Sequence, residues 1–209
     1  TSSKCDAILL TALDEIAWLL NARGSDVEYN PIIYSYLLVT QEETNWYVRK
    51  NQEDALDEET VASFDEMMGE GINILPYGSI DMALASLKDD PSVKKLYVDP
   101  STLNYNLYSV LLSNLGEDAV RFGKSPVPLR KSIKNEVELK GMKEAHIEDG
   151  LAMEKFYFWL EKQLAEGNTV TEWTAAEKLQ SYRSQAEGYM GDSFETISAY
   201  GEGAALPHY

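Results

Sequence analysis

Two histidines and several groups of carboxylates are the side chains of this 209-residue chain that could bind a metal ion or move a proton. His146 lies between Glu144, Glu148 and Asp149, a spacing that brings an imidazole and carboxylates together on a helix. Such spacings are common by chance, so we interpret His146 as a surface or helix-packing residue rather than a metal ligand. The other histidine, His208, is the penultimate residue.

A second group of carboxylates lies in the acidic stretch 53–71. Calcium loops of proteins repeat acidic residues as Asp-x-Asp-x-Asp-Gly, and this stretch lacks that pattern. Its apolar residues recur at helical spacing, so we predict a helix with a solvated acidic face.

Composition excludes several classes of protein. The net charge of −17 repels phosphate backbones, so we expect no nucleic-acid partner. The apolar runs are far shorter than the ~20 residues of a membrane span, and the first ten residues lack the pattern of a signal peptide. The single cysteine, Cys5, cannot form an internal disulfide, which is compatible with the cytosol. We therefore expect a cytoplasmic protein without a membrane partner.

The elements that must position any site are organised around residues 13–38. Apolar residues from Leu13 onward have helical spacing, and residues 32–39 are rich in β-branched and aromatic side chains, which predicts a buried strand. The loop between them carries Arg23 and Asp26. These two could form an ion pair or a subunit contact, and we favour a structural role that tethers the loop.

Strands and helices alternate up to about residue 125. This alternation predicts an α/β domain with a mixed sheet flanked by helices, opened by a β-hairpin. The predicted strands cover residues 5–11, 32–39, 43–49, 72–77, 95–99 and 119–122, and the predicted helices after the first cover 53–71, 79–87 and 100–115.

The pattern changes after residues 124–130, which contain two prolines and two basic residues and indicate a linker. Asn135 with Glu138 resembles a capping box and opens a predicted helix to Leu164, which Gly167 and Asn168 follow. We also predict a helix at 171–186 and a strand at 194–199. Two helices and one strand cannot enclose a core, so we expect this region to be incomplete, with an aromatic set that is mostly core and partly exposed: Phe156, Tyr157, Phe158, Trp159 and Trp173.

Three stretches of the chain together resemble one family. They read LDEIAWLLNARGSDVEYNPIIYSYLL at 13–38, KNEVELKGMKEAHIEDG at 134–150 and FETISAYGEGAALPHY at 194–209. In content and order they resemble the Xaa-Pro aminopeptidases of the three-domain, eukaryotic-like type. The resemblance implies a creatinase-like middle domain over 1–128 and the N-terminal part of a pita-bread metallopeptidase domain, itself an α+β fold, over 129–209.

The resemblance also implies an activity. Family members remove the N-terminal residue from peptides with proline in second position, using two divalent metals, commonly manganese, that activate a water molecule. Their five metal ligands, two Asp, one His and two Glu, follow the stretch equivalent to 194–209. We therefore expect no metal ligand in this chain and no activity from it alone. For the full-length parent we expect two divalent metals, proline-containing peptides as substrates and a possible homodimer.

One functional residue can be carried over from the family. His208, in Leu206-Pro207-His208-Tyr209, matches the active-site histidine of the family, which implies a catalytic and substrate-binding role. An imidazole there can donate to a substrate carbonyl or to a developing oxyanion. In this chain alone, the alternative is a frayed terminal residue. Residues 201–204, Gly-Glu-Gly-Ala, depart from the family, whose members usually carry Asn in this loop.

A second function belongs to a different class. Aminopeptidase-like domains can lose their metals and become peptide-binding or histone-binding modules, and an acidic chain suits a basic partner. The five metal ligands distinguish the two: their presence after Tyr209 supports the enzyme, and their absence supports the binding module.

Overall fold

The computed structural model describes residues 4–49 and 71–207. These residues form two compact units, Thr1–Ile133 and Lys134–Tyr209. The boundary predicted after residue 128 would divide helix α5 (Val127–Ser132). In the structure the whole of α5 belongs to the first unit, which ends at Ile133. The predicted helix over 53–71 lies outside the described residues, apart from Gly71.

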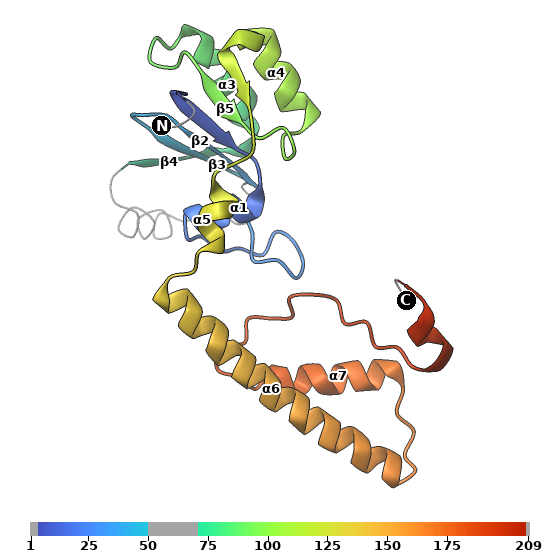
Figure 1. Ribbon diagram of the computed structural model, residues 1–209. Helices are drawn as coiled ribbons and strands as arrows, with labels where there is room; N and C mark the ends of the chain where they lie inside the picture. The colour runs from blue at the N-terminus through green and yellow to red at the C-terminus, as the bar shows by residue number, and fades with distance from the viewer. Residues whose placement is uncertain (1–3, 50–70, 208–209) are drawn as a thin grey trace. The chain divides into compact units, whose positions relative to one another are not determined.

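The first unit is built on a six-stranded sheet with the order β4-β3-β2-β1-β5-β6 (Figure 1). Strand β2 is antiparallel to both of its neighbours, whereas the other neighbouring pairs are parallel. The sheet is therefore mixed, as predicted. Its strands are β1 Ala7–Leu10, β2 Ser35–Val39, β3 Thr44–Val48, β4 Ile72–Pro76, β5 Leu96–Val98 and β6 Val120–Phe122.

The predicted hairpin is formed by β2 and β3, with Leu37 opposite Trp46. Strand β2 begins at Ser35 rather than at residue 32. The reason is that the preceding backbone is bound by the loop: the Asp26 N–H donates to the Ile32 carbonyl, and the Tyr34 N–H donates to the Asp26 carboxylate at 2.7 Å.

Helices cover both faces of the sheet. Successive residues of a strand point to opposite faces, so neighbours such as Leu37 and Leu38 enter different cores. Helices α3 (Ile80–Ser86) and α4 (Tyr105–Leu115) cover one face, and α1 (Leu13–Leu19) and α5 cover the other. Short 3₁₀ turns adjoin these elements at Tyr77–Ser79, Leu87–Asp89 and Glu117–Ala119.

Helix α4 starts later than predicted. It begins at Tyr105 rather than at residue 100, because Asp99 binds the backbone N–H and the hydroxyl of Ser101 in a turn. Asn104 then caps the helix by accepting from the Leu107 N–H. The predicted end is confirmed: Gly116 follows with a φ of 78°, a conformation that glycine adopts without strain.

The predicted linker 124–130 is partly wrong, because α5 forms within it. Pro126 and Pro128 lie at the N-cap and in the first turn, where a missing N–H removes no helical hydrogen bond. Val127 is buried in the same core as Ile16 of α1. The segment is therefore a packed helix of the first unit.

The second unit consists of α6 (Glu136–Ala165), α7 (Glu172–Arg183) and an extended segment that ends in a 3₁₀ turn, Gly201–Ala205. Helices α6 and α7 pack on each other. The capping box of Asn135 and Glu138 is confirmed, and Thr171 caps α7. The strand predicted over 194–199 is wrong: this stretch is extended, but the described residues of the unit contain no strand with which it could pair.

None of the helices among the described residues combines the length and the apolar character that crossing a bilayer needs.

One close backbone approach gives a test of the first unit. A Cβ added at Gly24 would lie 2.3 Å from Cγ1 of Ile33, whereas one added at Gly78 would meet no atom within 4 Å. We expect Gly24→Ala to lower the free energy of unfolding by about 1–3 kcal/mol. The reason is that Ile33, which packs against the core that contains Ile16 of α1, would have to move.

Denaturant unfolding followed by tryptophan fluorescence measures the effect, and Gly78→Ala is the matched control. The control should change the free energy by less than about 1 kcal/mol. Equal midpoints for the two variants would contradict the close approach.

Candidate functional site

Of the two histidines, the structure describes His146 but not His208. His146 is exposed on α6, and its Nδ1 lies 2.7 Å from the Met142 carbonyl oxygen one turn earlier. Because a carbonyl only accepts, Nδ1 carries the proton and donates. His146 is thus a surface residue, as interpreted. His208 lies outside the described residues, and its catalytic and substrate-binding role remains a prediction.

A metal centre needs several converging ligands. Within residues 4–49 and 71–207, no group of three or more His, Cys, Asp or Glu side chains is placed to hold a metal ion. The described residues therefore do not fit the two-metal centre of the family that the sequence resembles, and no catalytic step through metals can be derived from them.

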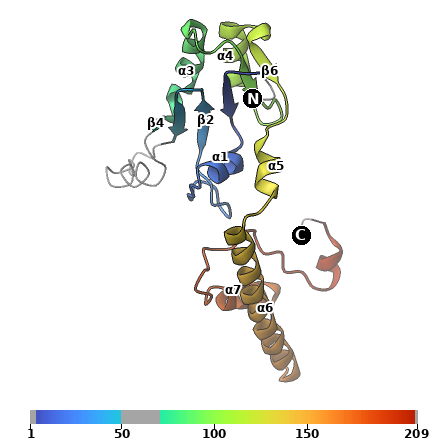
Figure 2. The same cartoon turned by 60° about the vertical axis from the view of Figure 1, so that its left-hand side comes forward.

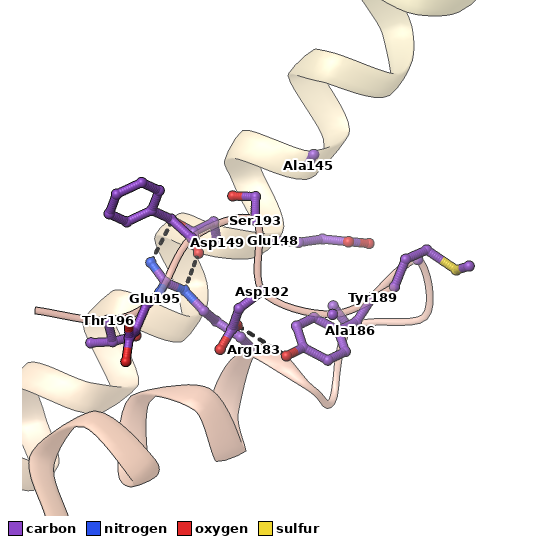
Figure 3. A pocket seen from close by; sticks show the side chains of 14 residues that line it. Ala145, Glu148, Asp149, Arg183, Ala186, Tyr189, Asp192, Ser193, Glu195 and Thr196 are labelled. Carbon is purple, nitrogen blue, oxygen red and sulfur yellow. Dashed lines mark hydrogen bonds and ion pairs between the residues drawn. The ribbon is translucent and has the colours of Figure 1, made fainter. Parts of the chain in front are cut away.

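A concavity lies in the second unit (Figure 3). It has a volume of about 630 Å³, within the usual range of ligand pockets. Residues of α6, the last residue of α7 and the extended segment after α7 form its wall. Figure 3 shows the Arg183 side chain reaching toward Asp149 and the Tyr189 ring beside Asp192.

An ion pair closes one side of this pocket. Arg183 Nε lies 2.6 Å from Asp149 Oδ1, and Nη2 lies 3.4 Å from Oδ2. The same guanidinium approaches the Met153 sulfur at 3.9 Å. This pair joins the end of α7 to the middle of α6. Its residues are 34 positions apart in sequence, so no local pattern could have indicated the pair.

The remaining pocket wall is acidic. Glu148, Asp192 and Glu195 add three carboxylates to the Arg183–Asp149 pair. The Tyr189 hydroxyl donates to Asp192 Oδ1 at 3.0 Å; partial burial and this hydrogen bond raise the pKa of Tyr189. The described lining residues include neither His nor Cys, so they offer no nucleophile-base pair. The pocket thus has the electrostatics to attract a cation but no catalytic constellation.

A buried carboxylate lies in the first unit, and the sequence did not single it out. Glu15 of α1 is only 6% exposed, and its Oε2 accepts from the Ser125 hydroxyl at 2.5 Å. The Ser125 N–H donates to Asp99 Oδ2 at 2.7 Å. Acids early in a helix are common at exposed N-termini, so the pattern gave no signal that Glu15 is buried.

The environments of the two carboxyls push their pKa values in opposite directions. Burial raises the pKa of Glu15, with smaller contributions that include its neighbours Asp14 and Asp99. Partial burial also acts upward on the pKa of Asp99, but hydrogen bonds from Ser101 and Ser125 outweigh it and lower that pKa.

The loop residues Arg23 and Asp26 have the structural role that we favoured. Arg23 Nη1 donates to the carbonyls of Ala17 and Ala22 at 3.1 and 2.9 Å. Asp26 accepts from the Tyr34 N–H. Each side chain therefore tethers the backbone of the loop between α1 and β2.

The aromatic set of the second unit is only partly packed. Phe156 and Trp159 are half-buried with ring centroids 6.0 Å apart, and Lys178 Nζ lies 5.8 Å from the Trp159 ring centroid. Tyr157, Phe158 and Trp173 are more than half exposed. The core prediction is thus wrong for these three, because the described residues of the unit provide nothing that covers them.

Two family models match the chain, and they meet a few residues after the boundary between the two units. The model of the Creatinase/Prolidase N-terminal domain matches residues 1–138, and that of Metallopeptidase family M24 matches residues 140–209. The fold and the matches define an α/β creatinase-type domain followed by metallopeptidase sequence. The chain belongs to the creatinase/prolidase N-terminal domain family.

Relatives of this chain are Xaa-Pro aminopeptidases, which confirms the resemblance. One from Caenorhabditis elegans is 39% identical over 99% of this chain, and a probable one from Tuber melanosporum is 37% identical over 100%. The crystal structure of X-prolyl aminopeptidase from C. elegans, described as a cytosolic enzyme with a di-nuclear active site, superposes with a TM-score of 0.87 at 38% identity. It is matched over 100% of this chain and 33% of its own.

The match covers only part of each relative. This chain spans 32% and 34% of the two relatives, that is, about a third of their length.

A double-mutant cycle tests the ion pair of the pocket. We expect Arg183→Gln and Asp149→Asn to show a coupling energy of about 0.5–1 kcal/mol, because the pair is bidentate and partly buried. The exposed Lys140–Glu144 pair, at 3.7 Å on α6, is the control, with an expected coupling of at most about 0.5 kcal/mol.

Thermal unfolding of the four variants of each cycle provides the numbers. A coupling for Arg183 and Asp149 that does not exceed the control would show that the pocket wall is not held by this pair.

Proposed function

We propose that these residues belong to a metal-dependent Xaa-Pro aminopeptidase, which removes the N-terminal residue from peptides with proline in second position. The observation that carries the proposal is the match along essentially the whole chain, at 38–39% identity, to aminopeptidases of this name. The M24 match over 140–209 supports a metallopeptidase. In this proposal the first unit is a creatinase-like middle domain, and the second unit forms the N-terminal part of the pita-bread domain.

The proposal assigns the chemistry to residues outside the described ones. Two divalent ions, manganese by preference, would be held by ligands from elsewhere in the whole protein, since the described residues do not supply them. When bound, such ions would lower the pKa of a water molecule and polarise the scissile carbonyl. These 209 residues alone would then be inactive.

His208 is the one residue of this chain that the proposal places in the reaction. Its imidazole would donate to the substrate carbonyl or to the oxyanion that forms during attack. The proposed substrates are peptides with proline in second position, the proposed location is the cytosol and the proposed assembly is a homodimer. The relative of known structure, described as cytosolic and di-nuclear, supports the location and the two metals.

The decisive experiment assays the whole protein, with whatever polypeptide precedes and follows these residues. With Mn²⁺ present, it should release the first residue from an Xaa-Pro peptide and leave a matched Xaa-Ala peptide largely intact. A metal-loaded protein that cleaves neither but binds a basic peptide would overturn the enzyme and support a metal-free binding module.

The two histidines of this chain give a matched pair of variants in the same assay. We expect His208→Ala to lower kcat/KM by about 10²-fold, the usual effect of losing one oxyanion donor. His146→Ala should leave kcat/KM unchanged, because His146 is exposed and bonded only within its own helix. Equal values for the two variants would remove His208 from the reaction.

A further inference from the structure

Helix α5 is the last element of the first unit, and two neighbouring residues of α1 hold it. Figure 2 shows α5 beside α1, and the two helices are in contact. Lys131 Nζ lies 2.6 Å from Asp14 Oδ2 near the end of α5. Val127, at the start of α5, is 5% exposed and packs in the core that contains Ile16.

The residue next to Asp14 makes the second attachment. Glu15 accepts from the Ser125 hydroxyl, and the Val127 N–H donates to the same hydroxyl oxygen at 3.3 Å. Ser125 is also held from the other side, by its N–H bond to Asp99 after β5. The buried carboxyl of Glu15 thus lies at the start of α5, where the chain leaves the sheet.

We propose that Glu15, Ser125 and Asp99, together with the Asp14–Lys131 pair, form a pH-sensitive latch that holds α5 on α1, closed when Glu15 is protonated and loosened when it is ionised. This latch is independent of the aminopeptidase activity proposed above. Residues 133–135 follow α5 directly and lead into α6.

The groups that face Glu15 decide the direction of the switch. Burial is the largest cause that raises its pKa, and the carboxylates of Asp14 on α1 and Asp99 after β5 act in the same direction. The Ser125 hydroxyl and the Lys131 ammonium of α5 act against it without reversing the shift. Lys124 faces Asp99, whose pKa it helps to lower, so Asp99 is ionised when Glu15 titrates.

The sign follows from linkage. A carboxyl whose pKa is higher in the docked state than its ordinary 4.5 binds a proton more tightly there, so protonation favours docking. As the pH rises from 4.5 to the raised value, docking weakens by up to about tenfold per pH unit. The protonated carboxyl keeps a carbonyl oxygen that accepts from Ser125, so closure does not need the charge.

Amide hydrogen exchange of this 209-residue chain tests the latch. Rates for residues 127–133 are measured from about pH 5 to about pH 8, expressed as protection relative to the intrinsic rate and referred to α4 of the same unit. We expect the relative protection of α5 to fall as the pH rises above 4.5, and then to level off above the pKa of Glu15.

Two variants separate the charge from the contacts. Glu15→Gln keeps an oxygen acceptor for Ser125 and cannot ionise, so its α5 protection should be high and independent of pH. Asp14→Asn removes the ion pair with Lys131 and should lower protection throughout while keeping a pH dependence. A Glu15→Gln variant with the wild-type slope would overturn the proposal.

A measurement on the unmodified chain guards against a variant that fails to fold. Carbon NMR of the Glu15 carboxyl follows its titration directly. We expect a midpoint above 4.5 that coincides with the change in α5 protection. A midpoint at the ordinary value, or one separated from the exchange transition, would overturn the latch whatever the variants show.

Discussion

The burial of both faces of three central strands is the constraint on which the first unit depends. Strands β1, β2 and β3 alternate their side chains between two cores, so a shift of register by one residue would exchange the two sets. Each large apolar side chain buried in this way contributes about 1.5–3 kcal/mol. The helices on each face are required because neither core can be left open to water. One core receives Leu9, Leu38 and Tyr47, and the other receives Leu10, Leu37 and Trp46.

The elements that sequence reasoning found are those whose signals are local. The hairpin of β2 and β3, the capping box at Asn135 and the glycine stop at Gly116 all depend on residues within a few positions of each other. The sequence does not predict the start of α4 correctly, because the Asp99 side chain accepts a hydrogen bond from the Ser101 N–H. The resulting turn keeps these residues out of the helix, which begins at Tyr105. Helix α5 is predicted as a linker because proline is common both in loops that interrupt helices and in the first turn of a helix.

The candidate sites were harder to anticipate because their contacts join distant residues. Glu15 and Ser125 are 110 positions apart, and Asp149 and Arg183 are 34 apart. Spacing in the sequence carries no information about such pairs, and only the resemblance to a family indicated His208. The resemblance could suggest a role for a single histidine, but it could not reveal which polar groups support the described fold.

The long helix α6 has a mechanical consequence. A continuous α-helix of 30 residues is a rod of about 45 Å, and its N-terminus is fixed by a capping box rather than frayed. A rod of this length acts as a lever: turning it by about ten degrees at its first residue would displace its far end by about 8 Å. Any small adjustment in the three residues before it is therefore magnified roughly to the scale of a side chain by the time it reaches Ala165.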